Sequence, residues 1–91
     1  MMDIRSYQII DSLYGKQDYL DQEELSDILG VSTRTIRELM KNVREEIKKH
    51  GALITYKNNL GYRMEIVDSR MFLTYIYIYR RSTHFIKFFE I

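Results

Sequence analysis

The sequence predicts a small α+β domain that is mostly α: three helices, then a two-stranded β-hairpin, then one further C-terminal segment. Three successive segments carry apolar residues at helical spacing, and two segments rich in β-forming residues follow with a turn between them. Ninety-one residues are enough for one such domain. Cysteine is absent, which excludes disulfides and thiolate metal sites and agrees with a cytoplasmic location.

The first predicted helix spans residues 3–15, where apolar residues three or four positions apart give one buried face. Asp3 is suited to cap its start and Gly15 to end it. A connector follows at residues 16–20, with a short extended piece at 19–20. The predicted buried face consists of Ile4, Tyr7, Ile10, Leu13 and Tyr14.

The second helix is predicted at residues 21–30. Asp21 at its start and Glu24 three residues later form the pattern of a capping box, and Gly30 permits a left-handed turn at its end. The third helix begins at Ser32, which is suited to be its N-cap, and continues to about Lys49. The predicted apolar faces consist of Leu25, Ile28 and Leu29 in the second helix and Ile36, Leu39, Met40, Val43 and Ile47 in the third.

Two helices joined by a short turn at a glycine, with a basic start to the second of them, are the pattern of a helix-turn-helix. The charge distribution supports this interpretation. Residues 1–30 carry two basic and seven acidic side chains, whereas residues 31–63 carry eight basic and three acidic ones. Five apolar residues are predicted to pack the second and third helices against the first. They belong to the core, and no contact with a binding partner is predicted for them: Leu25, Leu29, Val31, Ile36 and Leu39.

The polar side chains at the start of the third helix are the predicted contacts with DNA. The N-terminal residues of such a helix contact base edges in the major groove, where arginine can bond guanine. Arg34 and Arg37 are therefore predicted to contact bases, and Thr33 and Glu38 are further candidates. Ser32, Thr35 and Lys41 suit a phosphate. The alternative is an ordinary solvated helix face.

The predicted hairpin pairs residues 52–57 with 62–67 across a turn at 58–61. A hairpin after the recognition helix is the wing of a winged helix-turn-helix, and its tip lies near the adjacent minor groove or backbone. The residues suited to such contacts are Lys57, Asn58, Asn59 and Arg63. The alternative is a turn that contacts nothing.

The C-terminal segment, residues 68–91, holds seven of the twelve aromatic residues. We expect it to be a helix with a break near residues 82–83, although the alternation in "TYIYIY" also fits a strand. Either form is apolar on more than one face, so we expect it to pack against a second copy or a regulatory domain outside this chain. The expected domains are a DNA-binding unit at 1–67 and a linker, dimerisation or docking helix at 68–91.

The segment "YLDQEELSDILGVSTRTIRELMKNVREEIKKHGALITYKNNLGYRMEI" (19–66) resembles the N-terminal winged helix-turn-helix of bacterial regulators. The most similar are Mga-type activators and BglG-like regulators that carry phosphotransferase-system regulation domains. The hallmarks are "ELSDILGVSTRTI", the long third helix and "GYRMEI". The resemblance implies transcription regulation, and regulators of this kind carry regulatory domains that are absent from this chain. The chain is then either a DNA-binding fragment or a short stand-alone relative, and we expect a homodimer in the cytoplasm. Ser26 departs from the alanine usual at its position.

No catalytic or metal-binding pattern is found in the sequence. His50 and His84 have no nucleophile or carboxylate at a catalytic spacing, and neither a phosphate loop nor a metal motif is present. The longest apolar run is too short to span a membrane. We therefore expect that the protein is not an enzyme and binds neither a cofactor nor a membrane. The expected partner is double-stranded DNA. A protein-interaction module without DNA contact is the alternative, and RNA binding a weaker one because the aromatic residues lie outside the basic segment.

Overall fold

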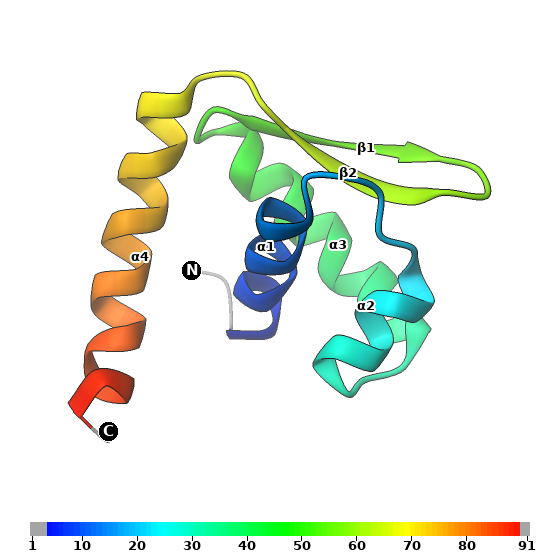
Figure 1. The fold of residues 1–91 in the computed structure, drawn as a ribbon, viewed down its shortest axis with the longest axis horizontal. Helices are drawn as coiled ribbons and strands as arrows, with labels where there is room; N and C mark the ends of the chain where they lie inside the picture. The colour runs from blue at the N-terminus through cyan, green and yellow to red at the C-terminus, as the bar shows by residue number, and fades with distance from the viewer. Residues whose placement is uncertain (1–3, 90–91) are drawn as a thin grey trace.

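The computed structural model describes the backbone of residues 4–89 and the side chains of residues 4–79, and it is a winged helix-turn-helix (Figure 1). Within these residues the order is α1 (Ile4–Lys16), α2 (Gln22–Leu29), α3 (Thr33–Lys48), β1 (Ala52–Lys57), β2 (Gly61–Ile66) and α4 (Ser69–Phe89). In Figure 1, α2 and the tip of the hairpin lie at one end and α4 at the other, with α1 and α3 between them.

The first helix buries the predicted face but differs at both ends. Tyr7, Ile10 and Leu13 are at most 1% exposed, whereas Ile4, in the first turn, is 55% exposed. Gly15 was expected to end the helix, and this is wrong: it lies inside α1, and Gln17 adopts the left-handed conformation with φ of 55°. The predicted cap, Asp3, lies outside the described residues.

The caps of α2 and α3 are confirmed. The Asp21 carboxylate accepts a hydrogen bond from the Glu24 amide at 2.8 Å, and the Glu24 side chain accepts one from the Asp21 amide at 3.2 Å. Gly30 adopts the left-handed conformation (φ 71°). Ile28 was predicted in the apolar face, but it is 57% exposed. The reason is that Leu25 faces the core from α2 and that Ile28 and Leu29 flank Leu25 on opposite sides of the helix. Leu29 packs against the core, and Ile28 faces solvent.

The core is shared by α1, α3, the hairpin and the first part of α4, with Leu20 of the connector and Leu25 of α2. The buried face of α3 consists of Ile36, Met40, Val43 and Ile47. The partly buried residues that pack against the core from the helix-turn-helix are Leu29, Val31 and Leu39. The predicted packing of α2 and α3 on α1 is therefore confirmed.

The hairpin pairs β1 with β2 in antiparallel register, with Ile54 opposite Met64 and Tyr56 opposite Tyr62. The expected extended piece of the connector is present as an isolated bridge between Leu20 and Tyr62. Their backbone groups exchange two hydrogen bonds of 2.8 Å. Gly61 permits this approach, because a Cβ atom there would collide with the Leu20 backbone. The bridge therefore holds the base of the hairpin tip against the connector between α1 and α2.

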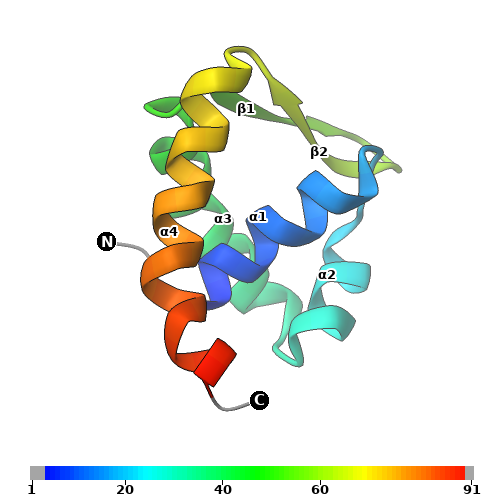
Figure 2. The same cartoon turned by 60° about the vertical axis from the view of Figure 1, so that its left-hand side comes forward.

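The C-terminal segment is one helix, α4, capped by the Asp68 carboxylate, which accepts a hydrogen bond from the Met71 amide at 3.0 Å. The break expected near residues 82–83 is absent, because serine and threonine do not prevent a helix from continuing. Figure 2 shows α4 alongside α1. The Tyr7 and Tyr79 rings stack with centroids 3.6 Å apart, and Phe72 contacts Tyr14.

Candidate nucleic-acid interface

The turn between α2 and α3 is fixed by hydrogen bonds of both backbone and side chain. The Gly30 amide donates to the Ser26 carbonyl at 2.8 Å, and the Ser26 hydroxyl donates to the Val31 carbonyl. Ser26 is thus more than a small residue between two helices, because its hydroxyl satisfies a carbonyl of the turn. This arrangement places the start of α3 at the surface.

The first turns of α3 present the predicted polar residues. Ser32, Arg34, Arg37, Glu38 and Lys41 are exposed, whereas Thr33 and Thr35 are half-buried. Ser32 caps α3: its hydroxyl accepts a hydrogen bond from the Thr35 amide at 3.1 Å and lies 3.0 Å from the Thr35 hydroxyl. These two hydroxyl groups are therefore occupied locally, and only part of their hydrogen-bonding capacity remains for a phosphate.

Both predicted base-contacting arginines have intramolecular partners. Arg34 Nε lies 3.3 Å from Glu38 Oε1, and this ion pair is open to solvent, with 83% and 65% of the two side chains exposed. Such an exposed pair is weak and readily exchanged for another partner. Arg37 Nη1 donates to Gln22 Oε1, the side chain of the first residue of α2, at 3.1 Å. Gln22 is a candidate that sequence reasoning missed, because the contact joins two helices.

The basic residues of α3 form one continuous row, the α3 basic row, and sequence reasoning considered only its first half. Steps of three, four, three and four place its members on one side of the helix. The row consists of Arg34, Arg37, Lys41, Arg44 and Lys48, and all five are exposed. The same spacing in the sequence was sufficient to find Arg44 and Lys48.

The wing residues separate into two places. Lys57, Asn58 and Asn59 are exposed at the tip, and the Lys57 ammonium lies 6.0 Å from the centre of the Tyr19 ring in the α1–α2 connector. Arg63 is also exposed, but it lies on β2. The hollow that Arg63 lines is formed with the end of α1 rather than with α3.

Comparison with known families agrees with this geometry. A family model described as an HTH domain matches residues 5–63, which is more than half of the chain. The chain belongs to the HTH domain family. The match covers α1, the α2–α3 pair, β1 and the start of β2. No curated protein and no solved structure matches the chain.

The HTH domain carries a tyrosine pair beside the basic row. Tyr56 and Tyr62 lie opposite each other on the hairpin with ring centroids 5.0 Å apart. Burial raises the pKa of Tyr62 and Tyr56 adds to the rise, whereas the guanidinium groups of Arg44 and Arg37 act in the opposite direction. Tyr56 and Tyr62 thus form one aromatic contact across the two strands of the hairpin.

The described part of the HTH domain contains no group of three side chains that could hold a metal ion. Among the described residues no helix is both long and apolar enough to cross a bilayer. The features that the structure brings together at the surface are therefore the helix-turn-helix, the basic row and the wing.

Proposed function

We propose that this HTH domain binds double-stranded DNA in a sequence-specific manner and regulates transcription. The observation that carries the proposal is the α3 basic row, which begins at the exposed N-terminus of the second helix of a helix-turn-helix. A B-DNA major groove about 12 Å wide admits an α-helix. The row gives that helix five cations for a polyanion.

The proposed contacts divide into two classes. Arg34 and Arg37, with Thr33 and Glu38, face base edges from the first turns of α3, and the exposed Arg34–Glu38 pair opens when a base competes for the guanidinium. The remaining residues hold phosphates or the minor groove, and they are Ser32, Thr35, Lys41, Lys57, Asn58, Asn59 and Arg63.

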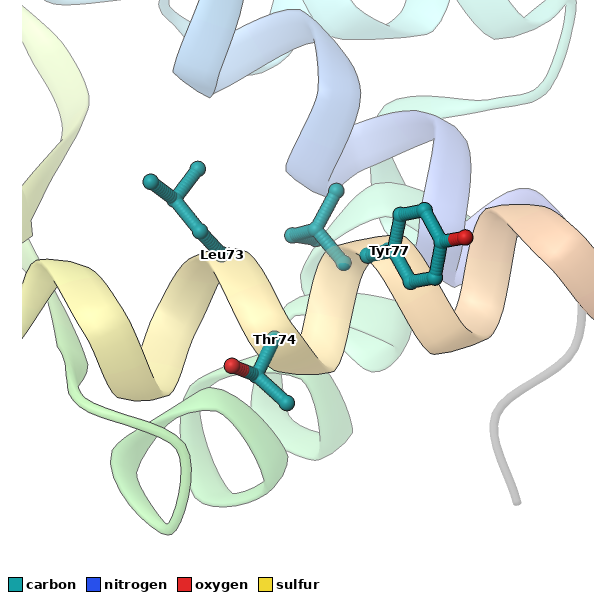
Figure 3. A pocket seen from close by; sticks show the side chains of 4 residues that line it. Leu73, Thr74 and Tyr77 are labelled. Atoms are coloured by element: carbon teal, nitrogen blue, oxygen red, sulfur yellow. The ribbon is translucent and has the colours of Figure 1, made fainter.

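We further propose that residues 1–67 form the DNA-binding unit and that the helix of residues 68–91 pairs two copies. Four apolar side chains of α4 that face away from the core are 47–62% exposed: Met71, Leu73, Tyr77 and Ile78. Figure 3 shows Leu73, Thr74 and Tyr77 at a hollow on this helix. Pairing here leaves the start of α3 free, because the start of α3 lies beside α2, at the end of the molecule opposite α4. Twofold symmetry then sets half-sites about 34 Å apart, or at multiples of that distance.

The resemblance of residues 19–66 supports a place among the Mga-type and BglG-like bacterial regulators, acting in the cytoplasm with regulatory domains outside this chain. In such a regulator the HTH domain binds DNA and catalyses no reaction. The rival function is a protein-interaction module, and the exposed apolar side chains of α4 favour it to the extent that they indicate self-association.

The deciding experiment selects duplexes from a randomised pool with the full chain and measures binding by fluorescence anisotropy across a salt series. We expect the affinity to fall as salt rises, and Arg37→Ala to lose about 1–3 kcal/mol and specificity at one base pair. Binding without salt dependence, or an Arg37→Ala variant with unchanged affinity, contradicts the proposal. Self-association without any retention of DNA favours the rival function.

A further inference from the structure

The α3 basic row continues to the place where α3 meets β1, beyond the residues that are proposed to contact bases. Arg44 and Lys48, the last two members of the α3 basic row, line a hollow together with Leu53 and Ile54 of β1. Glu45 also lines the hollow, where the two cations outnumber its charge. Arg44 lies about two helical turns beyond Arg37 on the same side of α3.

An exposed tyrosine lies on the same side of the hairpin. Residues of β1 alternate, and those that face the helices are Ala52, Ile54 and Tyr56. Ala52 and Ile54 are buried at 1% and 5% exposure, but the Tyr56 side chain extends past the core and is 56% exposed. The Tyr56 ring is therefore open to solvent near the tip of the hairpin.

Tyr56 contacts Tyr62 across the hairpin. The Tyr56 and Tyr62 rings are tilted by 55° with centroids 5.0 Å apart. Burial raises the pKa of Tyr62, and the positive charge of Arg44 acts in the opposite direction. Tyr62 is 8% exposed, so this contact joins a buried ring to the exposed ring of Tyr56.

We propose that Arg44, Lys48 and Tyr56 hold the phosphate backbone of the DNA strand that passes between α3 and the wing. This inference rests on the proposed function. When α3 lies in a major groove and the wing lies on the neighbouring minor groove, the sugar-phosphate strand that separates those grooves must cross the surface between α3 and the hairpin. Two cations and a phenol O–H at that surface match phosphate oxygens, which accept hydrogen bonds and carry negative charge.

These contacts have a property that distinguishes them from the base contacts: they are independent of sequence. Each cation that neutralises a phosphate releases counterions, so its loss lowers the salt dependence of binding by about one unit of the logarithmic slope. A tyrosine hydroxyl is neutral and releases none. Arg44, Lys48 and Tyr56 therefore carry different signatures in one assay.

The experiment uses the full chain, a fluorescein-labelled duplex of mixed sequence, and fluorescence anisotropy across a sodium chloride series. We expect Arg44→Ala and Lys48→Ala each to lower the slope by about one and to weaken binding about tenfold at low salt. Tyr56→Phe weakens binding about fivefold and leaves the slope unchanged. Lys49→Ala is the matched control, because Lys49 is an exposed neighbour outside the row. Thermal unfolding of each variant checks that the fold is retained.

The outcomes separate this inference from the function on which it rests. If wild type binds with salt dependence and Arg37→Ala loses specificity, but Arg44→Ala and Lys48→Ala have the slope of Lys49→Ala, the phosphate contacts are refuted and the proposed function stands. An effect of Arg44→Ala that differs between the mixed duplex and a selected duplex also refutes them, since it makes Arg44 a base contact. Wild-type protein that binds neither duplex overturns both.

Discussion

Two helices of this chain, α3 and α4, differ in where their apolar residues lie. In α3 the apolar side chains lie on one face, which is buried, and the rest of the helix is polar with a basic row. In α4, Phe72, Ile76 and Tyr79 are buried, while further apolar residues lie on the exposed sides. A helix that is apolar all round is typical of a buried position. The apolar face of α3 is therefore covered within the domain, whereas in α4, over residues 69–79 whose side chains the structure describes, large apolar residues are also exposed.

The largest expected effect concerns the inner face of α4, which belongs to the core as fully as that of α3. Phe72 is completely buried and contacts Tyr14. We expect Phe72→Ala to lower the free energy of unfolding by about 3–5 kcal/mol, because it leaves a cavity against α1. The control is Leu73→Ala, since Leu73 is 48% exposed and is expected to cost under about 1 kcal/mol in the monomer. Urea denaturation at low protein concentration measures both. Equal effects of the two substitutions contradict an α4 with distinct inner and outer faces.

A second prediction concerns the attachment of the wing to the connector between α1 and α2. Gly61 has φ of 105° and adjoins the Leu20 backbone, so Gly61→Ala is expected to cost about 1–3 kcal/mol through strain and collision. Gly15 is the matched control: it lies inside α1, and a Cβ atom there meets nothing within 4 Å. Gly15→Ala should therefore raise stability by up to about 1 kcal/mol. Thermal unfolding of the two variants checks the opposite signs, and a stable Gly61→Ala variant refutes the close approach.

The same two glycines show what sequence reasoning could and could not establish. Both lie in turn-like sequence contexts, and the sequence correctly placed the helices, the hairpin and the caps at Asp21 and Ser32. It misplaced the end of α1, because the left-handed residue is Gln17, and glutamine rarely adopts that conformation whereas glycine does so readily. A close approach such as that of Gly61 to Leu20 joins segments far apart in the sequence, so a local pattern carries no sign of it.

The candidate interface was predictable to the same extent. The first turns of α3 were found because capping and helical spacing are local properties. Arg44 and Lys48 follow the same helical spacing, but they lie beyond the N-terminal turns, and it is the residues of those turns that reach base edges. Gln22 and Tyr56 were not predictable, because their importance depends on contacts between different elements. The prediction of a break in α4 is wrong, because serine and threonine are polar but do not prevent a helix from continuing.

A third prediction tests whether α3 depends on α2 for the orientation of Arg37. Gln22 accepts a hydrogen bond from the Arg37 guanidinium at 3.1 Å, and both side chains are at the surface. If DNA binding is as proposed, Gln22→Ala leaves the guanidinium free to rotate and weakens binding to a selected duplex by about 1 kcal/mol. Binding to a mixed-sequence duplex changes less, because no phosphate contact is lost. A matched substitution, Glu23→Ala, removes a neighbouring exposed side chain of α2. Equal losses on both duplexes would make Gln22 a backbone contact instead.

The smallest expected effect concerns the contact between α3 and α4. His50, just after α3, stacks on the Tyr75 ring of α4 with centroids 4.0 Å apart, and Glu46 of α3 lies beside His50 at 3.5 Å. Burial raises the pKa of Tyr75, and the negative charge of Glu46 adds to the rise. The folded protein therefore holds the phenol proton more tightly than the unfolded chain does.

The sign of the pH dependence follows from that difference. The contribution of Tyr75 to stability is fully present below the unfolded pKa of about 10 and is lost as the pH rises through the raised pKa of the folded state. Tyr75→Phe has no proton to lose at this position, so its stability should fall less steeply than that of wild type above about pH 10. Urea denaturation of both proteins from neutral to alkaline pH tests this, with the neutral values as the reference. Parallel curves through the alkaline range would mean that α4 leaves Tyr75 in water, and that the contact between α3 and α4 is looser than the stack with His50 implies.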